Sequence, residues 1–263
     1  MNKNISLVAI IVAVCASFVS CINVTNTSKR GCGNIVTSER TVSAFEEINI
    51  RNNATVRFHA SNEFRVVVTT DENLHEYVEI DRRGSTLNIQ TRDRNRNRRG
   101  RVNVNRSVTI NGVSITNGIS FTQLIVDVYA PTLYGVRVSG SGSFENAKPL
   151  IVSSFETTVS GSGRITGRIE SEEFAARISG SGRITVFGSS EEAEIRISGS
   201  GQFNGNEFII NDAEARISGS GNANMHVTDN LEARISGSGS IRYQGNPRVD
   251  SRVTGSGRIR RVD

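Results

Sequence analysis

The sequence predicts an all-β protein: a right-handed parallel β-helix-like stack of about seven rungs, preceded by a less regular β region. Three observations carry this prediction: a recurring turn, alternating apolar residues before it, and recurring charges between them. Successive turns begin 18 to 21 residues apart, a spacing typical of stacked repeats. The turn reads Ser-Gly-Ser-Gly from Ser139, Ser160, Ser179, Ser198, Ser218 and Ser236, and Thr-Gly-Ser-Gly from Thr254.

The residues around each turn alternate as a strand requires. The position directly before the turn holds Val138, Val159, Ile178, Ile197, Ile217, Ile235 and Val253. The position five before it holds Tyr134, Phe155, Phe174, Ala193, Ala213, Leu231 and Val249, and the residue three before it is mostly small. Because strand side chains alternate with period two, these positions share one face, which we expect to point inward.

The opposite face of the same strand is charged. Two residues before the turn stand Arg137, Arg177, Arg196, Arg216, Arg234 and Arg252, and four before it stand Glu156, Glu194, Glu214, Glu232 and Asp250. Stacking would turn Arg177, Arg196, Arg216, Arg234 and Arg252 into a structural ladder beside a Glu ladder. Each exposed ion pair would contribute only about 0–1 kcal/mol, but together the pairs would offset repulsion between stacked Arg residues. Carboxylates that recur at one repeat position are typical of structure rather than of catalysis.

The composition of the turn fits a structural role. Gly supplies positive φ and lets backbones approach closely, and Ser hydroxyls satisfy nearby backbone groups. The alternative is a Gly-rich phosphate cradle. That function needs a strand–turn–helix context and a Lys, and the repeated turns have neither.

The N-terminus has the form of a targeting segment. Residues 1–20 hold Lys3 and then an apolar stretch, which is typical of a signal peptide. Cys21 follows at a site that resembles a bacterial lipobox, so we expect lipidation of Cys21 and a tether over residues 21–32; the alternative is ordinary signal cleavage. Cys32 would then have no disulfide partner, and we interpret it as a turn residue. The expected location is the outer membrane, with the leaflet undecided.

Residues 33–132 are predicted to form the less regular β region, and residues 133–263 the repeats. Asp71 to His75 fits one helical turn, and the Asn-Gly pairs at 111–112 and 117–118 indicate hairpins. Strand candidates, bounded by turn residues, are Ile48–Ile50, Ala54–Phe58, Phe64–Thr69, Tyr77–Ile80 and Thr86–Thr91.

An Arg-rich insert occupies residues 92–101. Its net charge of +5 equals that of the whole chain, so the basic balance belongs to this insert and not to the fold. It is interpreted either as a solvated hairpin tip or as a contact for an acidic polymer or anionic lipid. Nucleic acid is not an expected partner, because no recognition motif accompanies the charge. The candidate contacts are Arg92, Arg94, Arg96, Arg98, Arg99 and Arg101.

No catalytic or metal-binding motif is visible. The three His residues, His59, His75 and His226, are far apart in sequence and lack metal-ligand spacing. We therefore expect no metal, no cofactor and no enzymatic activity. A polysaccharide-active β-helix enzyme is the alternative, and unrepeated carboxylates clustered on one face would support it.

Two stretches give the chain a family resemblance. The opening from Gly31 to Arg40 with Phe45–Ile48, and the later Leu133–Gly142 with its repeats, resemble the family named "putative autotransporter adhesin, head GIN domain". The resemblance covers roughly Gly33 to Arg260. It implies an exported β-helix-like protein of the Gram-negative envelope, with no established catalytic residues to carry over.

The expected function is a non-enzymatic, exported lipoprotein that serves as a binding or adhesion module of the cell envelope. Its expected partners are the membrane, through the lipid anchor, and an acidic glycan or envelope polymer. A structural protein that self-associates into homo-oligomers is the main alternative.

Overall fold

The computed structural model describes residues 29–92, 106–110 and 113–262. In this part of the chain the structure is almost entirely β, and the one helix is the short 3₁₀ helix η1 (Glu72–Tyr77). No described helix is long and apolar enough to cross a membrane. The described residues of 29–102 and 119–263 form one compact unit, and residues 103–118 belong to another.

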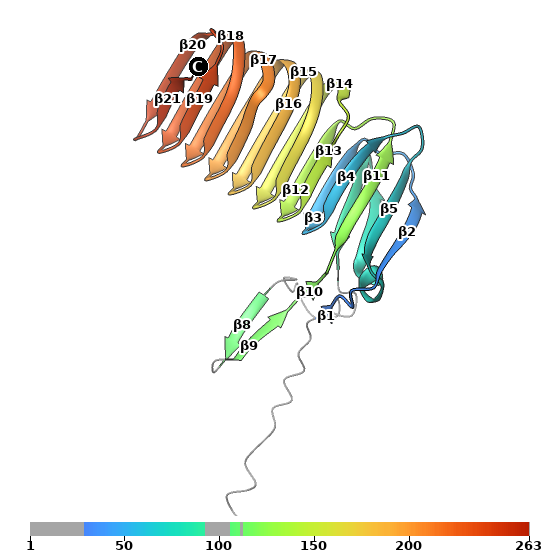
Figure 1. The fold of residues 1–263 in the computed structure, drawn as a ribbon. Coiled ribbons are helices and arrows are strands. Elements are labelled where there is room, and N and C mark those ends of the chain that lie inside the picture. Colours follow the sequence, from blue (N-terminus) through green and yellow to red (C-terminus); the bar gives the residue numbers. More distant parts are fainter. Residues whose placement is uncertain (1–28, 93–105, 111–112, 263) are drawn as a thin grey trace, which may run out of the picture. The chain divides into compact units, whose positions relative to one another are not determined.

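The repeats form the predicted parallel stack (Figure 1). Each long strand holds two extended segments, one after a turn and one before the next turn, and it pairs in parallel with the strands on either side. The segments before the turns lie in one sheet, which we call the ladder sheet, and those after the turns lie in the opposite sheet. The strands are β14 (Leu150–Gly161), β15 (Arg164–Gly180), β16 (Arg183–Gly199), β17 (Gln202–Gly219), β18 (Asn222–Gly237), β19 (Ser240–Gln244), β20 (Arg248–Thr254) and β21 (Arg258–Arg261).

The less regular region continues both sheets. The ladder sheet runs on through β12 (Gly135–Gly140), β3 (Glu47–Asn52), β7 (Thr86–Thr91) and β6 (Val78–Arg83). The opposite sheet runs on through β13 (Ser143–Asn146), β4 (Thr55–Ala60), β11 (Leu124–Ala130), β5 (Arg65–Asp71) and β2 (Ile35–Thr41). Pairing stays parallel as far as β7 and β11 and then becomes antiparallel.

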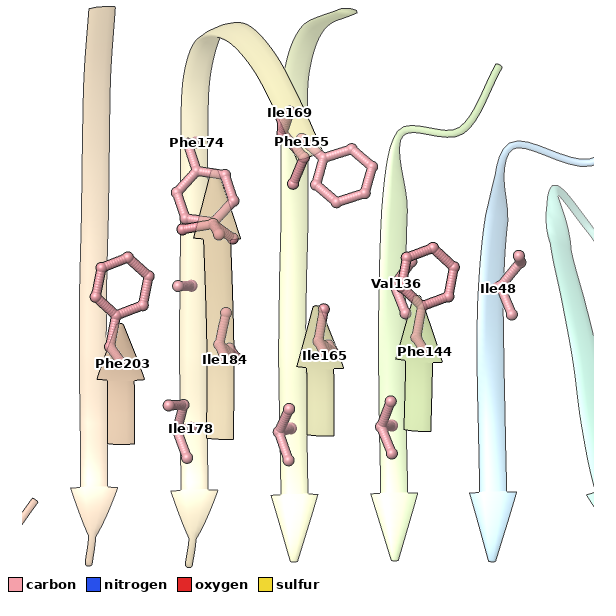
Figure 2. Packing of buried hydrophobic residues seen from close by; sticks show 14 of the residues in the cluster. Ile48, Val136, Phe144, Phe155, Ile165, Ile169, Phe174, Ile178, Ile184 and Phe203 are labelled. Carbon is pink, nitrogen blue, oxygen red and sulfur yellow. The ribbon is translucent and has the colours of Figure 1, made fainter. Parts of the chain in front are cut away.

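One hydrophobic core lies between the two sheets and extends from Phe45 to Ile241. Phe155, Phe174 and Phe203 lie in this core. Figure 2 shows the equivalent side chains Phe144, Ile165, Ile184 and Phe203 of successive rungs in one row. The alternation predicted before each turn is confirmed in β15, where Phe174, Ala176 and Ile178 are buried and the residues between them are not.

The inward assignment fails at both ends of the repeats. Tyr134 is 40% exposed because it precedes β12, and Leu133 is buried instead. Val249 and Val253 are 36% and 40% exposed, because β20 pairs with a described strand only along its β18 side.

The two positions in each turn require glycine for different physical reasons. The first always has positive φ, from 109° to 123°; at Gly199 a Cβ would also lie 2.8 Å from the carbonyl oxygen of Gly180. The second has an ordinary φ but no space: a Cβ on Gly221 would lie 2.5 Å from Cγ2 of Ile197 in the preceding rung. The predicted demand for positive φ is therefore confirmed at the first glycine only.

Residues 106–117 contain a hairpin of their own. Strands β8 (Arg106–Ile110) and β9 (Val113–Asn117) pair antiparallel across residues 111–112, as predicted. The hairpin predicted at 117–118 is wrong. Strand β10 (Ile119–Ser120) pairs in parallel with β1 (Lys29–Arg30) instead.

A buried carboxylate binds the start of the described chain to the body. Asp71 is fully buried at the end of β5 and accepts hydrogen bonds from the amides of Gly33 (2.9 Å) and Thr122 (2.7 Å). Burial by itself would raise the pKa of Asp71, but these hydrogen bonds outweigh it and hold the pKa below its ordinary value. The ionised Asp71 side chain therefore joins the segment around Gly33 to the segment that precedes β11.

We expect Gly199→Ala to lower the free energy of unfolding by about 1–3 kcal/mol, because alanine is strained at this φ and collides with the neighbouring rung. Urea unfolding followed by circular dichroism measures this. The matched control is Ser200→Ala, which alters an exposed side chain and keeps the amide that donates to Gly180. Equal midpoints for the two variants would contradict a requirement for glycine at this position.

We expect Asp71→Asn to lower stability at neutral pH, because it removes the charged acceptor. A depressed pKa stabilises the fold at pH values above the unfolded pKa, near 3.8, and that stabilisation is lost as the pH falls through the lower folded pKa. The difference in urea midpoint between wild type and variant should therefore be largest above pH 4 and shrink in more acidic buffer. A difference independent of pH would show that the ionised carboxylate is not responsible.

Candidate functional site

The outer face of the ladder sheet carries side chains in straight columns. In-register pairing places equivalent residues side by side on consecutive rungs, so each repeat position becomes a column. The Arg column consists of Arg177, Arg196, Arg216, Arg234 and Arg252. The acidic column beside it holds Glu194, Glu214, Glu232 and Asp250, with Ala175 and Glu156 on the two preceding rungs.

Ion pairs connect the two columns across rungs. Arg177 contacts Glu156 at 2.7 Å and Glu194 at 3.1 Å, although Ala175 stands on its own rung. Arg216 pairs with Glu214 at 2.7 Å on its own rung and lies 3.5 Å from Glu232 on the next. Each of these guanidinium groups is therefore held between two carboxylates of a continuous network.

The last pair of the network shows its effect on protonation. Arg234 donates to Asp250 at 2.7 Å. The hydrogen bond and positive charge of Arg234 lower the pKa of Asp250, and the same hydrogen bond raises the pKa of Arg234. Both residues therefore keep their charges over the physiological range.

Two grooves follow the columns. One of about 560 Å³ runs between the Arg column and the first Ser of each turn. The other, of about 580 Å³, lies beyond the acidic column and is bordered by Glu173, Glu192 and Asp212, six residues before their turns. Our sequence reasoning missed this second acidic column, although its recurrence at one repeat position could have revealed it.

Most of the predicted contact residues lie outside the described part of the chain. Of the Arg-rich insert only Arg92 is described. Its side chain lies 3.6 Å from Glu79, and its amide donates to the carbonyl oxygen of Tyr77. Arg94, Arg96, Arg98, Arg99 and Arg101, together with Cys21, are among the residues that the structure does not describe. Cys32 is described, and it is exposed and free.

The described residues show no metal-binding cluster, and neither of their two shifted carboxylates suits acid catalysis near neutral pH. No group of three or more His, Cys, Asp or Glu in this part of the chain is placed to hold a metal ion. The described carboxylates with a shifted pKa are Asp71 and Asp250, and both are shifted downward. A general acid working near neutral pH needs a raised pKa, so these two residues do not supply one.

Solved structures share this architecture. A "Putative lipid binding protein from Parabacteroides distasonis ATCC 8503" is 26% identical, with a TM-score of 0.70 over 90% of this chain and 100% of that one. A "putative adhesin" from the same strain is 25% identical, with a TM-score of 0.68 over 89% of this chain and 100% of that one. A "putative adhesin" from Bacteroides fragilis NCTC 9343 is 17% identical and shows the fold alone, with a TM-score of 0.74 over 89% and 99%.

Sequence comparison confirms the predicted resemblance. No curated protein matches the chain. The sequence profile of one family matches residues 44–247, which make up most of the chain. The family and the similar structures are named for adhesion or binding, which indicates an adhesion-like, non-enzymatic module exported to the cell envelope. The chain belongs to the family described as "Putative auto-transporter adhesin, head GIN domain".

Proposed function

We propose that the protein is an outer-membrane lipoprotein, anchored through lipid on Cys21, that binds an acidic glycan or envelope polymer. The observation that supports this most strongly is the set of in-register columns on the ladder sheet. Neighbouring strands lie about 4.8 Å apart, so the columns offer the same groups at a constant interval. An extended polymer would meet equivalent side chains at each step along the stack.

The ion pairs favour such a role because they hold the binding groups in place. Arg177 and Arg216 are each fixed by two carboxylates, which reduces the side-chain entropy that binding would otherwise cost. The Arg-rich insert at 92–101 would add an unbalanced positive charge that attracts a polyanion. Recognition would then combine long-range attraction by the insert with contact along the columns.

Self-association is the second candidate, and one edge strand favours it. Antiparallel pairing of β20 with β20 of a second copy, centred on Ser251, would place Asp250 opposite Arg252 and Val249 opposite Val253. The two valines are exposed, and the outer edge of β20 pairs with no described strand. Against this, Arg258, Arg260 and Arg261 on β21 would bring like charges together, a common protection of edge strands.

The binding role predicts that the wild-type protein retains polygalacturonate but not neutral dextran. Replacing Arg177 and Arg216 by Ser should weaken polygalacturonate binding about tenfold or more, because each lost charged hydrogen bond contributes roughly 1.5–3 kcal/mol. The matched control is Arg164→Ser with Arg183→Ser, which removes the same charge from exposed positions in the opposite sheet. Affinity is measured by biolayer interferometry at fixed ionic strength.

Three outcomes separate the candidates. If only the variant lacking Arg177 and Arg216 loses affinity for polygalacturonate, the column surface is supported as the binding site. If both double variants lose affinity equally, the attraction is only non-specific. Absence of wild-type binding, together with concentration-dependent dimers in analytical ultracentrifugation, would favour the self-associating role. Replacing the Arg residues at 94, 96, 98, 99 and 101 by Ser tests the contribution of the insert in the same assay.

The proposed anchor predicts that Cys21→Ala moves the protein from the membrane fraction to the soluble fraction. Metabolic labelling with a palmitate analogue should mark the wild type and not the variant. Cys32→Ala is the matched control, because Cys32 is a second cysteine of the expected mature chain and is exposed. If the Cys21→Ala variant is still labelled, the lipid is attached to another residue and the proposed anchor at Cys21 is wrong.

A further inference from the structure

The columns of the ladder sheet are interrupted on β12. At the repeat position of the acidic column this strand carries Gly135, which lies between Glu47 of β3 and Glu156 of β14. A cavity of about 260 Å³ opens on the outer face at this point. We call this cavity the Gly135 notch. It arises because glycine leaves out the side chain that the flanking rungs supply.

The same strand carries a guanidinium group that pairs with no carboxylate in the described part of the chain. Arg137 is exposed, lines the Gly135 notch, and has Asn49 and Thr158 as its neighbours in register. Among the described residues no carboxylate oxygen comes within 4.0 Å of Arg137. Glu156, on the next rung, pairs with Arg177 instead. The guanidinium of Arg137 therefore lines the notch without a direct carboxylate contact among the described residues.

Arg83, Glu47 and Glu156 also line the notch, together with uncharged hydrogen-bonding groups. The amide of Asn49 donates to Asn88 at 2.9 Å, and the hydroxyl of Thr86 donates to Glu47 at 3.1 Å. The Oδ1 atom of Asn49 is buried and accepts no hydrogen bond from a described residue. Buried acceptors are usually paired, so Asn49 has an unused acceptor just beneath the wall of the notch.

We infer that the Gly135 notch binds a single uronic acid unit, an inference that rests on the proposed glycan-binding function. The guanidinium of Arg137 would bind the sugar carboxylate, since Arg recognises carboxylates through paired hydrogen bonds. The carboxylate of Glu47, the hydroxyl of Thr158 and the amide of Asn49 would bind ring hydroxyl groups. The ligand thus carries one acidic group for Arg137 and several hydroxyl groups for the other polar groups of the lining.

The volume of the notch and the charges of its lining both limit which ligands it can bind. A volume of about 260 Å³ lies just below the ~300–1,000 Å³ usual for ligand pockets, so it suits one sugar ring rather than an oligosaccharide. A phosphate monoester would bring more negative charge than a carboxylate close to Glu47 and Glu156. A carboxylate carries a single charge, and the guanidinium groups of Arg83 and Arg137 both line the notch to face it. The polymer would then lie along the columns with one uronate seated in the notch.

The test is to titrate the full chain with D-galacturonate and with D-glucuronate and to monitor binding by ¹H–¹⁵N NMR spectra. D-galactose is the neutral control. Arg137→Gln should weaken uronate binding about tenfold or more, because the charged hydrogen bonds are lost. Gly135→Glu should do the same by filling the notch. A Cβ at this position would lie 3.3 Å from the carbonyl oxygen of Glu156 and 3.5 Å from Cγ of Glu47, so the substitution fits with a small adjustment.

Arg183→Gln, on the opposite sheet, is the matched control and should leave the uronate affinity unchanged. Equal uronate affinity in wild type and Arg137→Gln would overturn the inference. So would wild-type protein that binds galactose as tightly as the uronates, or that binds free amino acids more tightly than the uronates. Polygalacturonate binding separates the two proposals. If both notch variants keep wild-type affinity for the polymer, the notch assignment fails and the column surface stands. If wild type binds uronate but not the polymer, the proposed function fails and the notch remains.

Discussion

The register between successive turns is the constraint on which the rest of the structure depends. The amide of the third turn residue donates to the carbonyl oxygen of a glycine in the preceding turn, at 2.9 Å for Ser181, Ser200 and Ser220. These bonds hold each rung directly over the last. A slip of one residue would exchange inward and outward faces, placing Arg against the core and Ile in water. The two glycines make this contact possible, one through its φ and the other through the space it leaves.

Register also explains why charge is arranged as it is. Stacking identical rungs places like charges about 4.8 Å apart, which is unfavourable unless opposite charges lie beside them. The Arg and acidic columns meet this condition, and the pairs that cross between rungs share each charge between neighbours. A surface built in this way is regular and almost neutral. The columns would then contact a polymer along its length, and discrimination between ligand units would depend on positions where the repeat is broken, as at Gly135 and Arg137.

The less regular region ends the parallel stack on the side of β6 and β5. It continues both sheets but replaces parallel pairing by antiparallel pairing at β6 and β5, so the stack does not continue as further rungs at this end. Helix η1 passes from β5 in one sheet to β6 in the other. Asp71, immediately before η1, holds the first described segment in place through backbone amides. The buried carboxylate thus secures the point from which the predicted tether departs.

By itself the sequence determined the fold class, the place of each turn and the inward and outward positions of the repeats between the two end rungs, because these features recur at a fixed period. The pattern is local, and stacking then follows from parallel pairing. Only the tertiary structure decided the order in which β7, β3, β11 and β4 join the sheets, since residues such as Arg57 and Glu145, which pair at 2.9 Å, lie far apart in the chain. The same holds for the Gly135 notch: Gly135 and Arg137 were visible in the sequence, but Glu47, Asn49 and Asn88 reach them through pairings that no repeat encodes.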